Sequence, residues 1–155
     1  MEALAWDDEQ HLWRGEITLA DESCIEVVVV PKGVDSTLAL SYATFAFSLI
    51  VPKIDEARDF AARKLVKYYN YYNAHLQDGE QLTVEQFSQR LRLERIRFRG
   101  EGRASLDFAH TLYRGDNLYA GGLIVVDVTR EGSFKKPAWV TEPDAEELRR
   151  RRHFT

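Results

Sequence analysis

Cysteine is nearly missing from this chain of 155 residues, which contains a single one, Cys24. One cysteine cannot form a disulfide within the chain, and it cannot supply an all-cysteine metal site. Such low use of cysteine is typical of proteins from a reducing compartment. We therefore expect the protein to be cytoplasmic.

Long apolar runs are missing as well. The longest apolar stretch, residues 43–51, contains Thr44 and Ser48 and falls short of the roughly 20 residues that a membrane span needs. The first ten residues, MEALAWDDEQ, are acidic and lack the basic start and apolar centre of a secretory signal. These two absences predict a soluble protein with no membrane partner.

The sequence also lacks the motifs that mark common catalytic and cofactor sites. It contains no phosphate-binding GxxxxGK[ST], no GxGxxG, no GxSxG, no HExxH and no CxxC. The nearest approach to a catalytic dyad is Asp107 and His110, but residues three apart on a straight strand face opposite sides. We predict no cofactor, no metal ligands and no catalytic residue, and a small hydrolase or transferase using Asp107 and His110 is an alternative.

Charge is present but unevenly distributed. The net charge is −4, and residues 1–35 hold nine acidic and two basic side chains, which is −7, so the remaining 120 residues sum to +3. With 45% hydrophobic and 30% charged residues, the composition favours one compact domain. We expect this domain to span residues 1–141 and a basic tail to occupy residues 142–155.

Apolar spacing predicts a β-hairpin followed by two helices. Residues 11–20 alternate loosely and residues 24–30 are apolar, with a turn between them. The run at residues 27–30 lacks polar alternation, so we expect that strand to be covered on both faces. A first helix should begin near residue 37, capped by Asp35 or Ser36, and a second should begin near Pro52. We expect the apolar face of the first helix to comprise Leu38, Tyr42, Phe45 and Leu49.

The second helix contains KYYNYYNAHL at residues 67–76, which holds four of the seven tyrosines. Helical spacing predicts one buried stripe, made of Ala61, Leu65, Tyr68, Tyr69, Tyr72 and Leu76. Tyr71 instead falls on a flank with Lys64, Lys67 and His75. This flank is either a solvated helix side or a contact surface for a partner, because tyrosine is enriched at interface hot spots.

The C-terminal half predicts a short helix and several strands. Thr83 and Gln86 have the spacing of a capping box. From residue 95 the chain alternates with period two, which places three arginines on one strand face: Arg95, Arg97 and Arg99. These arginines either grip phosphate or carboxylate groups of a partner, or form an exposed sheet face. Further strands are expected at residues 103–110, 118–128 and 133–141, the last at a sheet edge because of Pro137.

These elements together predict an α+β fold. We expect an antiparallel sheet of five to six strands, packed against a long broken helix pair and one short helix.

Thr83-Val-Glu-Gln-Phe87 matches the pattern Thr-x-Glu-x-Phe, and Tyr119-Ala-Gly-Gly-Leu-Ile-Val-Val126 is close to aromatic-x-Gly-His-x-Ile-x-Val, with a turn glycine later at Gly132. On these motifs, residues 73–140 resemble a family of small uncharacterised bacterial proteins that carry a domain of unknown function. The sequence departs from the family pattern at Gly122, where the pattern has histidine. The resemblance implies a stand-alone small protein and includes toxin-neutralising immunity proteins among its suggested functions, but it implies no reaction.

We therefore predict a non-catalytic protein-binding module, with an immunity-type inhibitor of a toxin as its most concrete version. The partner should be another protein, and the predicted contact residues are the two basic surfaces: Lys64, Lys67, Tyr71 and His75, and Arg95, Arg97 and Arg99. The alternative from a different class is a nucleic-acid-binding protein that uses the arginine strand face and the basic tail. Salt dependence separates these two, because binding to phosphates weakens steeply with salt.

Overall fold

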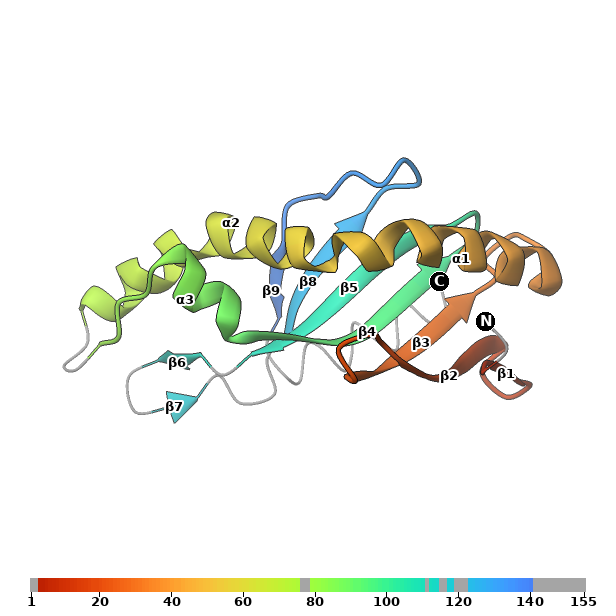
Figure 1. Ribbon diagram of the computed structural model, residues 1–155, viewed down its shortest axis with the longest axis horizontal. Helices are drawn as coiled ribbons and strands as arrows, with labels where there is room; N and C mark the ends of the chain where they lie inside the picture. Colours follow the sequence, from red (N-terminus) through yellow and green to blue (C-terminus); the bar gives the residue numbers. More distant parts are fainter. Residues whose placement is uncertain (1–2, 76–78, 111, 115–116, 119–122, 141–155) are drawn as a thin grey trace.

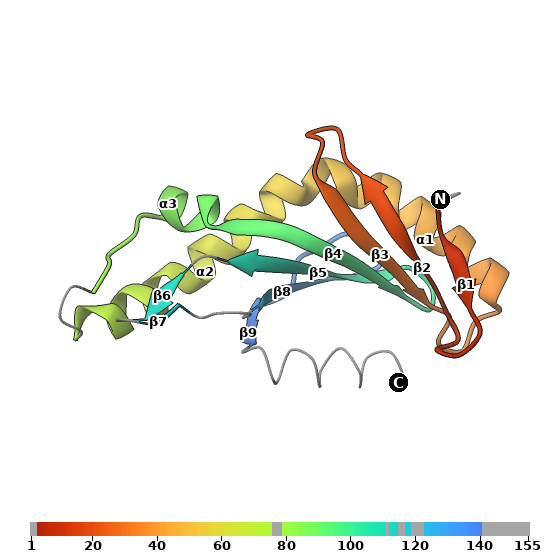
Figure 2. The same ribbon diagram turned by 90° about the horizontal axis from the view of Figure 1, so that it is seen from below.

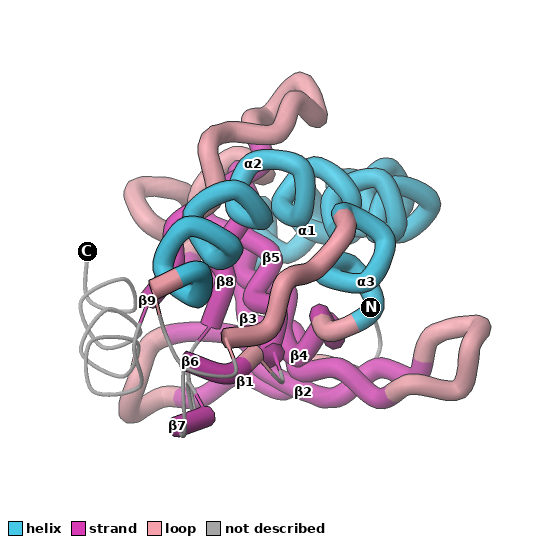
Figure 3. Tube along the Cα trace, turned by 90° about the vertical axis from the view of Figure 1, so that its left-hand side faces the viewer, coloured by secondary structure: helices cyan, strands magenta, loops and turns pink. Residues whose placement is uncertain are grey.

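The computed structural model describes residues 3–75, 79–110, 112–114, 117–118 and 123–140. The described chain forms two layers, a twisted sheet and a long helix that crosses one face of it (Figures 1 and 3). The main sheet has seven strands, in the spatial order β1 (Ala5–Asp7), β2 (Leu12–Thr18), β3 (Cys24–Val30), β4 (Leu91–Arg99), β5 (Arg103–His110), β8 (Leu123–Val128) and β9 (Ala138–Val140). Two short strands, β6 (Tyr113–Arg114) and β7 (Asn117–Leu118), pair separately.

The α+β prediction is confirmed, and the main sheet has one strand more than the upper number expected. The hairpin of β2 and β3 forms as predicted, and β9 lies at the sheet edge. Neighbouring strands are antiparallel except β3 and β4, which are parallel. Parallel neighbours need a crossover connection, and the long helix supplies it.

The predicted helix pair is one nearly continuous rod. Helix α1 (Ser36–Ile50) passes through a 3₁₀ turn, η1 (Val51–Lys53), directly into α2 (Ile54–Ala74). The Asp35 carboxylate accepts hydrogen bonds from the backbone N–H groups of Thr37 and Leu38, at 3.0 and 3.2 Å, which confirms the predicted cap. Pro52 lies at the start of the 3₁₀ turn, a position where its missing N–H is tolerated, so the helix continues.

The predicted inner face of α1 is wrong. The side chains of Leu38, Phe45 and Leu49 are 49%, 67% and 46% exposed, and the buried residues are instead Ala39, Ala43, Ala46 and Ile50. Both sides of this helix are apolar, so spacing alone could not choose between them. The small alanine side chains let the helix backbone approach the sheet closely, and that close packing decides which side is buried.

The predicted burial of the tyrosines is correct only for Tyr69, which is 3% exposed, whereas Tyr68 and Tyr72 are 56% and 52% exposed. The buried stripe of α2 advances in steps of four through Ala61, Leu65, Tyr69 and Asn73, and the other tyrosines lie beside it. The Tyr69 hydroxyl donates to Glu80 at 2.9 Å. Its ring contacts Phe87 and Trp139, which belong to a short helix and to β9.

The core fills the space between the long helix and the sheet. Every second side chain of the central strands faces the helix, among them Val27, Val29, Ile96, Phe98, Leu106, Phe108, Ile124 and Val126. Residues 27–30 are all buried, as their unbroken apolar run predicted. The short helix α3 (Val84–Gln89) begins with the predicted capping box, in which the Gln86 backbone N–H donates to the Thr83 hydroxyl at 3.1 Å.

Candidate functional site

The long helix covers one face of the sheet, and we call the other the helix-free face (Figure 2). The three predicted arginines of β4 alternate with Ile96 and Phe98, which pack in the core under the helix, so the arginines lie on the helix-free face. Arg95 donates from Nε to Glu26 at 2.6 Å, and Arg97 donates from Nη2 to Asp107 at 2.7 Å. The expectation of an exposed arginine row is therefore wrong for Arg97, which is 2% exposed. Arg95 and Arg97 are engaged inside the protein, and of the three, Arg99 is the least firmly paired.

The surroundings of Arg97 are buried and polar. In the described part of the chain, Arg97 Nε and Nη1, Ser105 Oγ and Asp107 Oδ2 have no hydrogen-bond partner. Ser105 is the cross-strand neighbour of Arg97 and is fully buried. Buried polar groups usually find partners, so this cluster carries a desolvation cost that the Arg97–Asp107 ion pair offsets only in part. Because the site is buried, the attraction between the Arg97 guanidinium and the Asp107 carboxylate is stronger than it would be in water, which holds the two charges together.

Asp107 and His110 do not form a dyad. This agrees with their spacing, which predicted that they face opposite sides of the strand. Asp107 faces Arg97 on the helix-free face, whereas the His110 ring packs against Trp139 on the other face, with centroids 5.3 Å apart. His110 Nδ1 accepts a hydrogen bond from the Leu112 backbone N–H at 3.4 Å. Burial lowers the pKa of His110 from 6.5 to about 4 and keeps the imidazole neutral.

Of the predicted flank, Lys64, Lys67 and Tyr71 lie on α2, and His75 is the residue that caps its C-terminal end. The Tyr71 ring, 66% exposed, lies edge-on to the ring of His75 at 5.3 Å and to that of Tyr72 at 5.9 Å. The Lys64 ammonium lies 5.8 Å from the centre of the Phe60 ring. These ring contacts restrict the rotamers of the exposed aromatic side chains.

Sequence reasoning missed the apolar half of the same helix. Leu38, Phe45 and Leu49 stand on the outer side of α1, and residues 36–50 contain no charged side chain. A signal was available in Ala39, Ala43 and Ala46, whose regular spacing of small residues marks a side that can pack closely. If the alanines are buried, Leu38, Phe45 and Leu49 must be exposed, and no charged residue accompanies them on α1.

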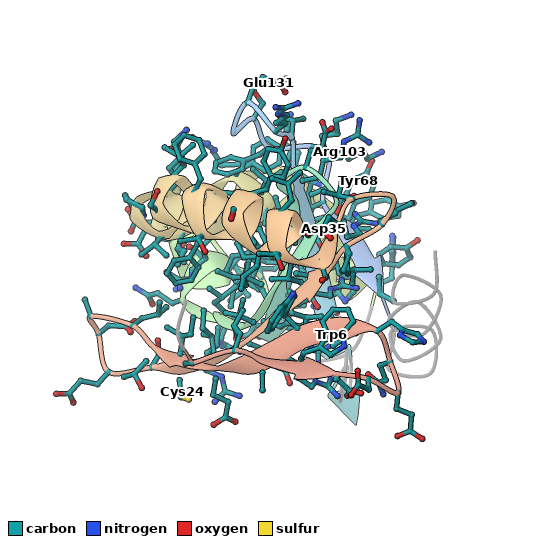
Figure 4. The ribbon with its side chains drawn as sticks, turned by 90° about the vertical axis from the view of Figure 1, so that its right-hand side faces the viewer. Trp6, Cys24, Asp35, Tyr68, Arg103 and Glu131 are labelled. Atoms are coloured by element: carbon teal, nitrogen blue, oxygen red, sulfur yellow. The ribbon has the colours of Figure 1, made fainter. Side chains whose placement is uncertain are left out.

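A cleft of about 730 Å³ lies where the β4–β5 hairpin, the end of β3 and the β8–β9 turn meet. Its walls carry five cationic side chains, from Lys32, Arg99, Arg103, Arg130 and Lys135, and three acidic ones, from Glu101, Asp127 and Glu131. Figure 4 shows Arg103 and Glu131 on the same side of the molecule, away from Cys24. We call this site the basic cleft. Its residues come from three distant segments, so spacing in the sequence could not reveal it.

The described residues contain no cluster of three His, Cys, Asp or Glu side chains suited to a metal ion. Cys24 is exposed, and its Sγ lies 3.7 Å from a carboxylate oxygen of Glu16. By length and composition, Ser36–Ala74 could cross a membrane, but one side of this helix packs on the sheet. The predicted tail at residues 142–155 and the motif glycines at 121 and 122 lie outside the described residues.

Neither a curated protein nor a solved structure matches the chain. A family model described as "Uncharacterized protein conserved in bacteria" (DUF2262) matches residues 1–138, which is most of the chain and covers the long helix, the basic cleft and the strands up to the first residue of β9. The chain therefore belongs to this family of uncharacterised proteins conserved in bacteria.

Proposed function

We propose that this protein is a non-catalytic protein-binding module whose contact surface is the outer side of the long helix. One observation carries the proposal. In the described chain, the large apolar side chains that are exposed all lie on this helix, namely Leu38, Phe45, Leu49, Tyr68, Tyr71 and Tyr72. Together with Lys64, Lys67 and His75, we call them the outer helix face.

The α1 half of this face is apolar. Leu38, Phe45 and Leu49 follow one another along one side, separated only by uncharged residues. A contiguous apolar patch on a soluble protein marks an interaction site. A partner that covers these side chains would remove them from water, which is a favourable free-energy term of about 25 cal/mol per Å² of apolar surface.

The α2 half of this face is basic and aromatic. Lys67 has no ion pair among the described residues, and Tyr71 presents most of its ring to solvent. Tyrosine supplies a large contact area at a low cost in side-chain entropy, and it is enriched at the residues that dominate binding energy. We infer a partner that offers acidic groups to Lys64 and Lys67 and apolar groups to Tyr71 and Phe45.

The two alternatives have less support. A nucleic-acid-binding strand face needs accessible arginines, but Arg97 is buried on Asp107, and Arg95 is bound to Glu26. A hydrolase or transferase needs Asp107 and His110 on the same side, and they occupy opposite faces of β5. An immunity-type inhibitor of a toxin is a narrower form of our proposal, because such an inhibitor requires a complementary surface and no reactive group. A cytoplasmic location belongs to the same proposal, since exposed Cys24 stays reduced there.

The proposal is tested by capture with the tagged protein from its bacterial host at low and high salt, followed by mass spectrometry. We expect a protein that is retained at high salt by the wild type, lost with Phe45→Ser and Tyr71→Ser, and retained with Arg103→Gln, which changes the basic cleft instead. Folding of each variant is checked by circular dichroism. Partners captured equally by all four proteins would overturn the proposed surface.

Two further measurements identify the class of partner. Sedimentation equilibrium of the purified protein shows whether the partner is a second copy of this chain. Co-sedimentation with anionic lipid vesicles shows whether the apolar half of the outer helix face binds a membrane surface instead, and such binding, if abolished by Phe45→Ser, would replace the protein partner.

A further inference from the structure

The basic cleft contains two arginines that face each other at the end of a hairpin. Arg99 and Arg103 are direct cross-strand partners of β4 and β5, so their Cβ atoms lie about 4.5–5.5 Å apart on the same face. The turn between them fixes this pairing, because Gly100 and Gly102 adopt φ values of +56° and +95°. Like charges directly opposite each other destabilise a sheet, so the pair needs an anion nearby.

The carboxylates of the cleft neutralise this charge incompletely. Asp127 lies 3.9 Å from Arg99, which is beyond hydrogen-bonding distance, and Glu101 is engaged by Arg130 at 2.8 Å. Among the described residues, the side chains of Lys32, Arg103 and Lys135 have no carboxylate partner. Burial lowers the pKa of Arg99; the negative charge of Asp127 opposes this shift, and the positive charges of Arg97 and Arg103 add to it. A bound anion would reduce the repulsion that Arg99 experiences from Arg97 and Arg103.

The shape of the cleft favours a compact ligand. Its volume of about 730 Å³ lies within the range of small-molecule sites and exceeds what a single phosphate ion fills. Cations approach it from three segments: Lys32 beyond β3, Arg99 and Arg103 on the hairpin, and Lys135 after the β8–β9 turn. A phosphate group has several oxygens to receive donors from different directions, and arginine binds phosphate oxygens in pairs.

The acidic residues of the cleft argue against an extended polyanion. Glu101 and Glu131 are exposed members of the same cleft and would repel a nucleic-acid backbone that continued past the site. We propose that the basic cleft binds a small phosphate-bearing molecule of about nucleotide size, held by Arg99, Arg103 and Lys135. This site is separate from the outer helix face and does not depend on the protein-binding function.

The proposal is tested by thermal unfolding and isothermal titration calorimetry with adenosine monophosphate and inorganic phosphate as probes, at constant ionic strength. We expect both probes to raise the unfolding temperature in a saturable way, because a ligand that binds only the folded state stabilises it. Adenosine monophosphate should bind more tightly, because it fills more of the cleft. No saturable effect of either probe at millimolar concentration would overturn the proposal.

Variants separate the cleft from general charge effects. Arg103→Gln should weaken binding about tenfold or more, as loss of a charge-assisted partner does, while the protein without ligand stays at least as stable, because the repulsion from Arg99 is removed. Lys135→Gln should also weaken binding and provides a second variant if Arg103→Gln fails to fold. Arg92→Gln removes an exposed arginine of β4 outside the cleft and should leave binding unchanged. Equal losses in all three variants would overturn the assignment to the cleft.

A single-stranded oligonucleotide completes the test. We expect it to bind no more tightly than adenosine monophosphate per phosphate group and to compete poorly for the cleft. An oligonucleotide that binds more than about a hundredfold more tightly, with a steep loss at high salt, would replace the small-molecule ligand by a nucleic acid.

Discussion

Arg97 and Asp107 form a buried ion pair across the neighbouring strands β4 and β5, with 2.7 Å between Nη2 and Oδ1. Their side chains are 3% and 0% exposed, so neither charge is screened by water in the folded protein. Arg97, which was predicted to contact a partner, is therefore part of the interior. The stability of the sheet depends on both members of the pair.

We predict that Asp107→Ala lowers the free energy of unfolding by about 3–5 kcal/mol, because it leaves the Arg97 guanidinium buried without a counter-charge. Replacing both residues by leucine should cost less than the single change. The measurement is urea-induced unfolding. Glu101→Ala is the matched control, since its partner Arg130 is exposed and such surface pairs contribute about 1 kcal/mol or less. Equal effects of Asp107→Ala and Glu101→Ala would contradict the prediction.

Truncation of Tyr69 should destabilise the protein far more than truncation of Tyr72. Tyr69→Ala removes a buried ring between Phe87 and Trp139 and should cost about 3–5 kcal/mol, whereas Tyr72→Ala changes an exposed side chain and should cost less than about 1 kcal/mol. Tyr69→Phe should lose about 1 kcal/mol with the hydrogen bond to Glu80. Chemical unfolding of the three variants gives these values, and a large loss for Tyr72→Ala would show that the helix is rotated.

His110 should make stability fall as the solution becomes acidic. Its pKa is lowered from 6.5 to about 4 by burial, so between these values the unfolded chain binds a proton that the folded protein excludes. The free energy of unfolding has its full value above pH 6.5, the ordinary pKa of histidine, which applies in the unfolded chain. It decreases by about 1–3 kcal/mol as the pH falls toward the lowered pKa of His110 in the folded protein.

The measurement compares urea unfolding at about pH 7 and about pH 5. His110→Gln should reduce the difference between the two conditions, whereas His75→Gln, at an exposed position, should retain it. An unchanged difference in His110→Gln would show that other groups cause the acid sensitivity.

Gly15 should tolerate no side chain. A Cβ atom there would collide with the backbone carbonyl of Ala3 and approach the buried side chain of Leu4 at 2.9 Å. Gly15→Ala should therefore displace the N-terminal segment and cost about 1–3 kcal/mol. The adjacent exposed Glu16→Ala should change stability by less than about 0.5 kcal/mol. Unfolding curves, with hydrogen exchange of residues 3–7, test this. Unchanged protection in Gly15→Ala would contradict it.

Local signals in the sequence predicted much of the architecture. The Asp35 cap and the Thr83 capping box form as expected because they depend on residues within one turn. The alternation on β5 correctly separated Asp107 from His110, because side chains on a strand take opposite faces at odd spacing. The flank around Tyr71 was found for the same reason, since helical spacing places its members together.

Other features depend on contacts between distant segments. Sequence spacing indicated that α1 has apolar sides but not which one is buried, because Phe45 and Ala43 both satisfy an apolar pattern. Arginine alternation placed Arg97 on the correct face but could not reveal its ion-pair partner Asp107 on the neighbouring strand, ten residues away. The basic cleft joins segments from residue 32 to residue 135, so no local pattern contains it.

The sequence by itself determined the helices, their caps, the strand alternation and the membership of Tyr71 in a basic flank, because those depend on backbone geometry and neighbours within a few residues. The tertiary structure decided that alanines rather than Phe45 face the sheet, that Arg97 is buried with Asp107, and that Arg99 and Arg103 meet in a cleft. The physical reason is that close packing and desolvation act between side chains that only the complete fold brings into contact.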